Sequence, residues 1–164
     1  LLQKLTITGL GASSFTEAMA AMHEVSLTAE REFKQGTLEQ WAPTMFHGFE
    51  VMESMNRYFK RVREGDEEEA LTIVRDIDPK GMLQRLVQLD LAHTEENVVH
   101  YFSGKVDGEG KRRYIPAKPQ LFRIGDIIEM QVTLESGSRK GEKMTHRMKL
   151  ILRAIVLLDE RYTQ

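Results

Sequence analysis

A change of pattern near Thr94 constrains this chain of 164 residues more than any other feature of its sequence. Before Thr94, apolar side chains recur every three or four residues, which is the spacing of an amphipathic helix. After it, apolar side chains alternate with polar ones, as on a strand with one buried face. The pattern predicts a single α+β domain over residues 1–164, with a helical part at 1–93 and a β part at 94–164.

About four helices are predicted in the helical part. The first begins at Ser13, Ser14 or Thr16, which are all good N-cap residues, and the second has a stripe rich in Met and Phe that we interpret as core. The third has an acidic first turn, where the helix dipole favours negative charge. The fourth also fits a strand in part. The four predicted helices cover residues 13–36, 44–63, 66–76 and 82–91.

The β part predicts about four strands. A strand over 97–106 and its return at 111–115 flank the turn residues 107–110, which is a hairpin signal. Two further strands are predicted at 125–135 and 144–158, and the second becomes apolar on both faces from Leu150, as a central strand does. We expect the helical layer to pack on an antiparallel sheet. A small barrel of the oligonucleotide-binding type is the alternative.

Charge is divided unevenly along the chain, although the formal net charge is only −2. Residues 1–96 hold 10 Lys and Arg against 17 Asp and Glu, whereas residues 97–164 hold 13 against 8. The simplest interpretation is that both charged regions are solvated surfaces. A chain with this division can also associate with a second copy or bind an anionic partner. We therefore expect a homodimer, and we keep a protein partner and nucleic acid as further candidates.

The residue types that carry covalent and metal chemistry form no known signature. The chain has no cysteine, no serine lies in a nucleophile elbow, and the five histidines are scattered. We therefore predict no catalytic residue, no cofactor and no metal site, and an enzyme of unrecognised type is only the third functional hypothesis. No apolar stretch approaches the roughly 18 residues of a membrane span, and no signal-peptide pattern opens the chain. We expect no membrane partner and an intracellular protein, cytoplasmic or nuclear.

Basic side chains interleaved with aromatic rings are the strongest hint of a ligand. Cations that meet phosphates, beside rings that stack on bases, are typical of proteins that bind single-stranded nucleic acid. Edge strands also carry Lys and Arg because these residues prevent aggregation. The leading hypothesis is therefore a non-catalytic interaction module that self-associates, and single-stranded nucleic-acid binding is the alternative. The candidate residues are Lys111, Arg112, Arg113, Tyr101, Tyr114, Arg139, Lys140, Lys143 and Arg147.

Three segments of the chain carry a resemblance to other proteins. They are residues 93–102 (HTEENVVHYF), 122–131 (FRIGDIIEMQ) and 152–159 (LRAIVLLD). Together they resemble a group of uncharacterised proteins predicted in many mushroom-forming fungi, and the similarity extends over most of the chain. The resemblance implies a eukaryotic, intracellular setting. It implies no activity, cofactor or residue role.

Overall fold

The chain forms two compact units, each built from segments that are far apart in the sequence. A computed structural model describes residues 1–63, 69–87, 90–139 and 145–161. The first unit consists of residues 1–3, 56–131 and 153–164, and the second consists of residues 4–55 and 132–152.

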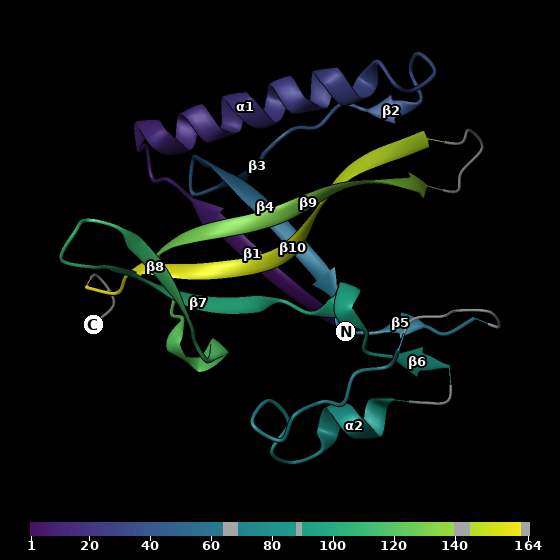
Figure 1. Cartoon of the computed structure of the whole chain (residues 1–164). Coiled ribbons are helices and arrows are strands. Elements are labelled where there is room, and N and C mark those ends of the chain that lie inside the picture. Colours follow the sequence, from purple (N-terminus) through teal and green to yellow (C-terminus); the bar gives the residue numbers. More distant parts are fainter. Residues whose placement is uncertain (64–68, 88–89, 140–144, 162–164) are drawn as a thin grey trace. The chain divides into compact units, whose positions relative to one another are not determined.

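Strands dominate the described residues (Figure 1). Within these ranges the chain has ten strands, two α-helices and two short 3-10 helices, η1 and η2. In chain order the elements are β1 (Leu2–Thr8), α1 (Ser13–Glu30), β2 (Leu38–Glu39), β3 (Thr44–Phe46), β4 (Phe49–Arg57), β5 (Lys60–Arg61), α2 (Met82–Leu86), β6 (Leu91–Ala92), η1 (Glu95–Asn97), β7 (His100–Val106), β8 (Arg112–Pro116), η2 (Pro119–Leu121), β9 (Ile127–Arg139) and β10 (Thr145–Asp159).

The second unit contains α1 and strands in the order β1–β4–β10. Strand β10 pairs in parallel with β4, where Ile151 lies opposite Met55, and also in parallel with β2. Strand β3 pairs antiparallel with β4. The first helix begins at Ser13, one of the three predicted start residues, but its N-cap is Ala12 and no side chain caps it. The helix ends at Glu30 rather than near residue 36. The core of this unit is made by Met19, Leu38, Val51, Met52, Met148, Leu150 and Leu152.

In the first unit the strand order is β10–β7–β8, and β5 and β6 form a separate pair. Strands β7 and β8 form the antiparallel hairpin that the sequence predicts. Strand β10 pairs in parallel with β7, where Ile155 lies opposite Tyr101. The apolar second half of β10 is buried, as expected of a central strand, and Val156 is fully covered. The core is made by Tyr58, Phe59, Ala92, Val99, Ala154, Ile155, Val156 and Leu157.

The prediction of about four helices on an antiparallel sheet or small barrel of about four strands is wrong. Eight strands are hydrogen-bonded in one mixed sheet, with both parallel and antiparallel pairs, and the described residues hold only two α-helices. The predicted helix at 82–91 is limited to α2, and β6 follows it. Of the predicted helix at 66–76, residues 66–68, which include Glu67 and Glu68, lie outside the described residues, and residues 69–74 form no helix.

The largest error is the predicted helix over residues 44–63, where the structure has strands β3, β4 and β5. Along β4 and the residue after it, Met52, Ser54, Asn56 and Tyr58 are buried at a spacing of two. Two of these four are polar, so the alternation of a strand is not visible as an alternation of hydrophobicity. The Met and Phe residues meanwhile happened to fall at helical spacing, and that coincidence produced the wrong prediction.

A tight turn at His47–Gly48 joins β3 to β4. Phe46 and Phe49 form the last pair of the hairpin, so the loop has two residues. Both loop residues have positive φ, 49° at His47 and 85° at Gly48. Positive φ at both positions is the requirement of a type I′ turn, in which glycine is the favoured second residue. The dipeptide was therefore a hairpin signal within a stretch that was read as helix.

Candidate functional site

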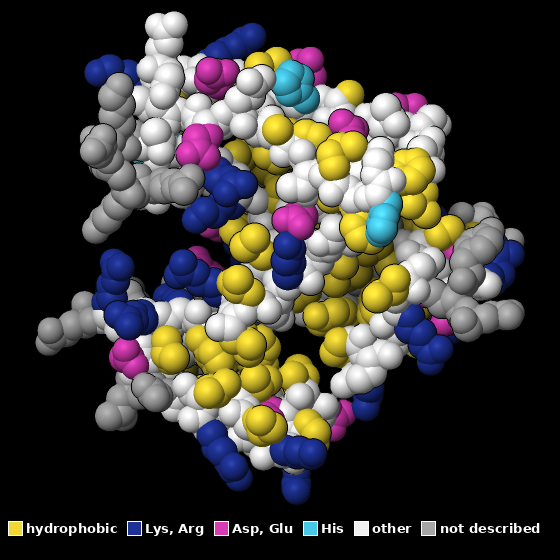
Figure 2. All heavy atoms as spheres, turned by 180° about the vertical axis from the view of Figure 1, so that it is seen from behind, with side chains coloured by type: hydrophobic (Ala, Val, Ile, Leu, Met, Phe, Trp, Pro, Cys, Tyr) yellow, Lys and Arg dark blue, Asp and Glu magenta, His cyan; other side chains and the backbone are white. Residues whose placement is uncertain are grey.

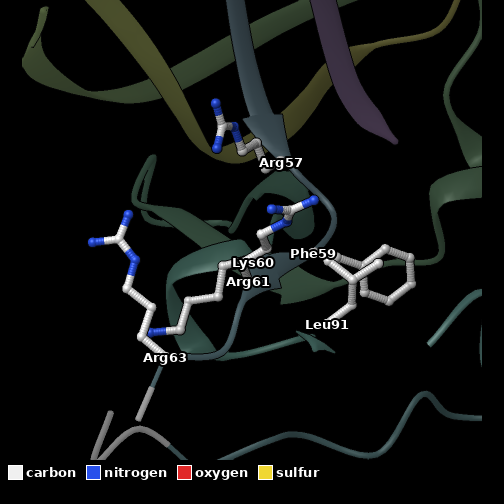
Figure 3. A pocket seen from close by; sticks show the side chains of 6 residues that line it. All are labelled: Arg57, Phe59, Lys60, Arg61, Arg63 and Leu91. Atoms are coloured by element: carbon white, nitrogen blue, oxygen red, sulfur yellow. The ribbon is translucent and has the colours of Figure 1, made fainter. Parts of the chain in front are cut away.

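The first unit contains a cleft of about 450 Å³ beside strand β5 (Figure 3). Four of its six lining residues carry a positive charge, and the other two are apolar. We call it the basic cleft. Figure 3 shows the two apolar side chains next to each other, with cationic side chains extending away from them. The lining residues are Arg57, Phe59, Lys60, Arg61, Arg63 and Leu91.

Local pairing explains why these side chains gather. Strand β5 follows β4 after a two-residue break and pairs antiparallel with β6, which places Arg61 opposite Leu91. The N–H of Val62 continues the ladder by donating to the carbonyl of Asp90 at 2.8 Å. Phe59 is only 8% exposed, so the ring anchors this segment while its charged neighbours remain accessible. The β5–β6 pairing and the buried ring of Phe59 therefore hold the backbone that carries the cleft side chains.

Ring contacts stabilise Tyr58 and Phe59, the two residues between β4 and β5. The Tyr58 ring stacks on the ring of His93 with centroids 4.6 Å apart, and it also meets the ring of Phe59 edge-on at 4.9 Å. Nδ1 of His93 lies 2.7 Å from the carbonyl oxygen of Tyr58, which is hydrogen-bond distance. The N–H of Tyr58 donates to the carbonyl of Leu1 at 3.0 Å. Burial raises the pKa of the Tyr58 phenol, so this ring is neutral at pH 7.

The charge of the cleft is weakly compensated at Arg61. Its Nε lies 3.8 Å from the carboxylate of Asp90, and the two side chains are 81% and 58% exposed. An ion pair this long and this exposed contributes little, because water screens it and both side chains keep their freedom. Guanidinium groups donate several hydrogen bonds in a planar fork that matches phosphate and carboxylate oxygens. The basic cleft is therefore suited to an anionic ligand.

The predicted basic residues of the β7–β8 hairpin do come together, but they face acidic side chains of their own chain. Nε of Arg113 donates to the carboxylate of Asp107 at 3.0 Å, and Nη1 of Arg112 lies 3.6 Å from the carboxylate of Glu129. The hydroxyl of Tyr114 donates to Glu129 at 3.4 Å. These contacts offset part of the positive charge that the sequence suggested. Lys111, at the start of this group, is exposed.

The other predicted binding residues are distributed as follows. Tyr101 is half-buried in β7, packs on the ring of Phe122 at 5.4 Å, and has its phenol pKa raised by that burial. A ring in this position is a packing residue rather than an open stacking platform. Arg147 is exposed in β10 and belongs to the second unit, as does Arg139 at the end of β9. Lys140 and Lys143 lie outside the described residues.

The sequence analysis missed the basic cleft although its signal is local. Residues 57–63 read RYFKRVR, which places four cations within seven positions. This stretch falls at the end of the predicted helix over residues 44–63 and was not among the predicted binding residues. A run of cations at the end of a strand, next to a buried aromatic ring, would have pointed to the cleft.

No protein family, no characterised protein and no solved structure matches this chain. The resemblance to the fungal group therefore stays a prediction. Across the described ranges, no three His, Asp or Glu side chains are placed so that they could share a metal ion. In the same ranges, no helix is both long and apolar enough to cross a membrane.

Proposed function

We propose that this protein is a non-catalytic binding module that holds a single strand of nucleic acid at the basic cleft. The observation that carries the proposal is the concentration of four cations among the six residues that line the cleft. When Lys and Arg side chains bind phosphate groups, condensed counterions are released from the nucleic acid. This release supplies most of the affinity of sequence-independent binding. Such a ligand is met inside the cell, so an intracellular location, cytoplasmic or nuclear, forms part of the proposal.

The lining favours recognition of the backbone over recognition of the bases. Phe59 is 8% exposed, so it presents little ring surface for stacking. Binding is therefore expected to depend on phosphates and to vary little with sequence. A single strand can bend to bring successive phosphates into a cleft of about 450 Å³. A duplex is stiff over about 150 base pairs, so it bends less readily than a single strand into so small a site.

The test is fluorescence anisotropy with labelled single-stranded DNA and RNA of about 12 nucleotides, which is within the usual site size. We expect micromolar affinity at low salt. The logarithm of the affinity should fall linearly with the logarithm of the salt concentration, by about 0.7 for each phosphate contact. No detectable binding at low salt would overturn the proposal.

Matched variants locate the site. Replacing both Arg57 and Arg61 by Ala should lower the salt slope by about 1.4, at about 0.7 for each lost phosphate contact. The control replaces Lys111 and Arg112, in the β7–β8 hairpin, by Ala, and it should leave the slope unchanged. Arg57, Arg61, Lys111 and Arg112 are all exposed, so neither double variant should unfold the protein. If the hairpin variant lowers the slope and the cleft variant does not, the binding site is the hairpin and the assignment to the basic cleft is wrong.

A further inference from the structure

An exposed apolar surface lies on α2 and the turn before it, in the first unit. Four large apolar side chains within 13 residues are 47–61% exposed. Figure 2 shows hydrophobic side chains gathered on the part of the surface that carries α2, with Lys and Arg side chains at the margin. Apolar surface that stays exposed and contiguous marks an interaction site more often than scattered single residues do. We call this surface the α2 patch; it consists of Val74, Ile77, Met82 and Leu86.

The α2 patch is held by a defined scaffold. The buried carboxylate of Asp78 accepts hydrogen bonds from the N–H of Met82 at 2.7 Å and from the N–H of Gln84 at 2.9 Å, which fixes the first turn of α2. Asp76, on the same turn, pairs with Lys118 at 2.9 Å. Met82 and Leu86 are four residues apart and therefore lie on one face of the helix. No residue of α2 is buried, so its apolar face is open to solvent in the part of the unit that the structure describes.

The charges around the α2 patch indicate which sign of charge a partner surface should carry. Arg75, Lys80 and Arg85 are exposed within the same segment. The two acidic residues of the segment are already engaged, Asp78 in capping α2 and Asp76 in its pair with Lys118. The accessible surface therefore combines apolar side chains with positive charge. A complementary partner is a helix that offers negative charge together with a small apolar contact.

Helix α1 has this character. It contains Glu17, Glu24 and Glu30 but neither Lys nor Arg. Glu17 and Glu24 are seven residues apart and exposed, so they lie on one outward face, and Val25 beside them is 39% exposed. The buried residues of α1, Met19 and Ser26, belong to the opposite side. The outward face of α1 is therefore acidic and partly apolar.

We propose that the α2 patch binds the outward face of α1 from a second copy of this chain. In this contact Val25 covers apolar side chains of the patch, and Glu17 and Glu24 meet its cations. The basic cleft is also cationic, but its ring Phe59 is buried, so it offers α1 little apolar surface. The inference is independent of nucleic-acid binding, because it uses different residues.

Charge reversal tests the contact in the full chain. Light scattering and sedimentation at low salt should show a mass above that of one chain, rising with concentration and falling with added salt. Glu24→Lys and Arg85→Glu should each weaken association about tenfold, because each turns an attraction into a repulsion. A mixture of the two variants should associate like the wild type. In one contact the two reversed charges face each other. In the next contact the unchanged Glu24 of one variant faces the unchanged Arg85 of the other. Recovery in the mixture distinguishes the contact from a general effect of charge.

Two further variants separate the alternatives. Leu86→Ser should weaken association without changing its salt dependence, because it removes only apolar contact. Arg61→Glu, in the basic cleft, should leave association unchanged. The inference is overturned by a wild-type chain that stays monomeric at the highest concentration, by a mixture that does not recover, or by loss of association in Arg61→Glu alone. The last result would place α1 of the second copy in the basic cleft instead.

Discussion

The turn before β7 offers the sharpest test of how the first unit is held together. The side-chain oxygen of Asn97 accepts hydrogen bonds from the N–H of Thr94 at 3.1 Å and from the Thr94 hydroxyl at 3.2 Å. Both residues are buried, at 4% and 1% exposure. Asn97→Ala removes the shared acceptor and leaves two donors where water does not reach. We therefore predict a large loss of stability from this single substitution.

The magnitude follows from the geometry of the two donors. A buried donor that loses its acceptor costs about 1–3 kcal/mol. The hydroxyl of Thr94 can rotate toward another acceptor, whereas its backbone N–H is fixed and takes the larger penalty. The free energy of unfolding should fall by about 3 kcal/mol, which is a large part of the 5–15 kcal/mol typical of a domain.

Urea denaturation followed by circular dichroism measures this loss as a lower midpoint. Glu95→Ala is the matched control, because Glu95 lies in the same turn and is exposed, and the expected change is within about 0.5 kcal/mol. Thr94→Val removes only the hydroxyl donor and should cost about 1 kcal/mol. If Asn97→Ala shifts the midpoint no more than Glu95→Ala does, the buried acceptor does not hold the turn and the argument fails.

Two more predictions concern local chemistry. Gly48→Ala should lower the free energy of unfolding by about 1 kcal/mol in the same urea assay, because Gly48 has φ of 85° and an L side chain is strained there; an unchanged midpoint would contradict the turn assignment. Hydrogen bonds from Arg161 lower the pKa of Asp159 to about 2. An NMR titration should show this value, and Arg161→Ala should return the pKa toward 3.8. Because the pKa is lowered, any stability from this pair is present above the ordinary pKa and lost as the pH falls toward 2. The backbone N–H of residue 161 still donates to Asp159 in the variant, so an unchanged pKa would show that the Arg161 side chain is not the cause.

The sequence predicted the elements that are determined by residues close to one another along the chain. The β7–β8 hairpin depends on neighbouring residues, namely the turn at 107–110. The two long strands β9 and β10 were recognised in position because their alternation is visible along the chain. The parallel pairing of β10 with β7 was missed, because it joins Ile155 to Tyr101 across more than 50 residues and leaves no local trace.

The surroundings of the candidate binding residues could not be predicted from the sequence for a similar reason. Glu129 of β9 faces both Arg112 and Tyr114, and nothing in the hairpin sequence indicates that neighbour. The basic cleft needs the pairing of β5 with β6, which places Leu91 opposite Arg61 although they are 30 positions apart. In both cases the charge that surrounds a side chain depends on tertiary structure, which the local sequence does not show.

A buried polar residue of β4, Asn56, also determines which side chains face the basic cleft. Nδ2 of Asn56 donates to the carbonyl of Glu96 at 2.9 Å, and Nη1 of Arg153 donates to the same carbonyl at 2.7 Å. A strand that slips by one residue turns every side chain to the opposite face. Such a slip would also break the hydrogen bond of Asn56, because its amide would then point away from the carbonyl of Glu96. The hydrogen bond of Asn56 therefore fixes the register at the end of β4, keeps Tyr58 inside, and leaves Arg57 facing the cleft.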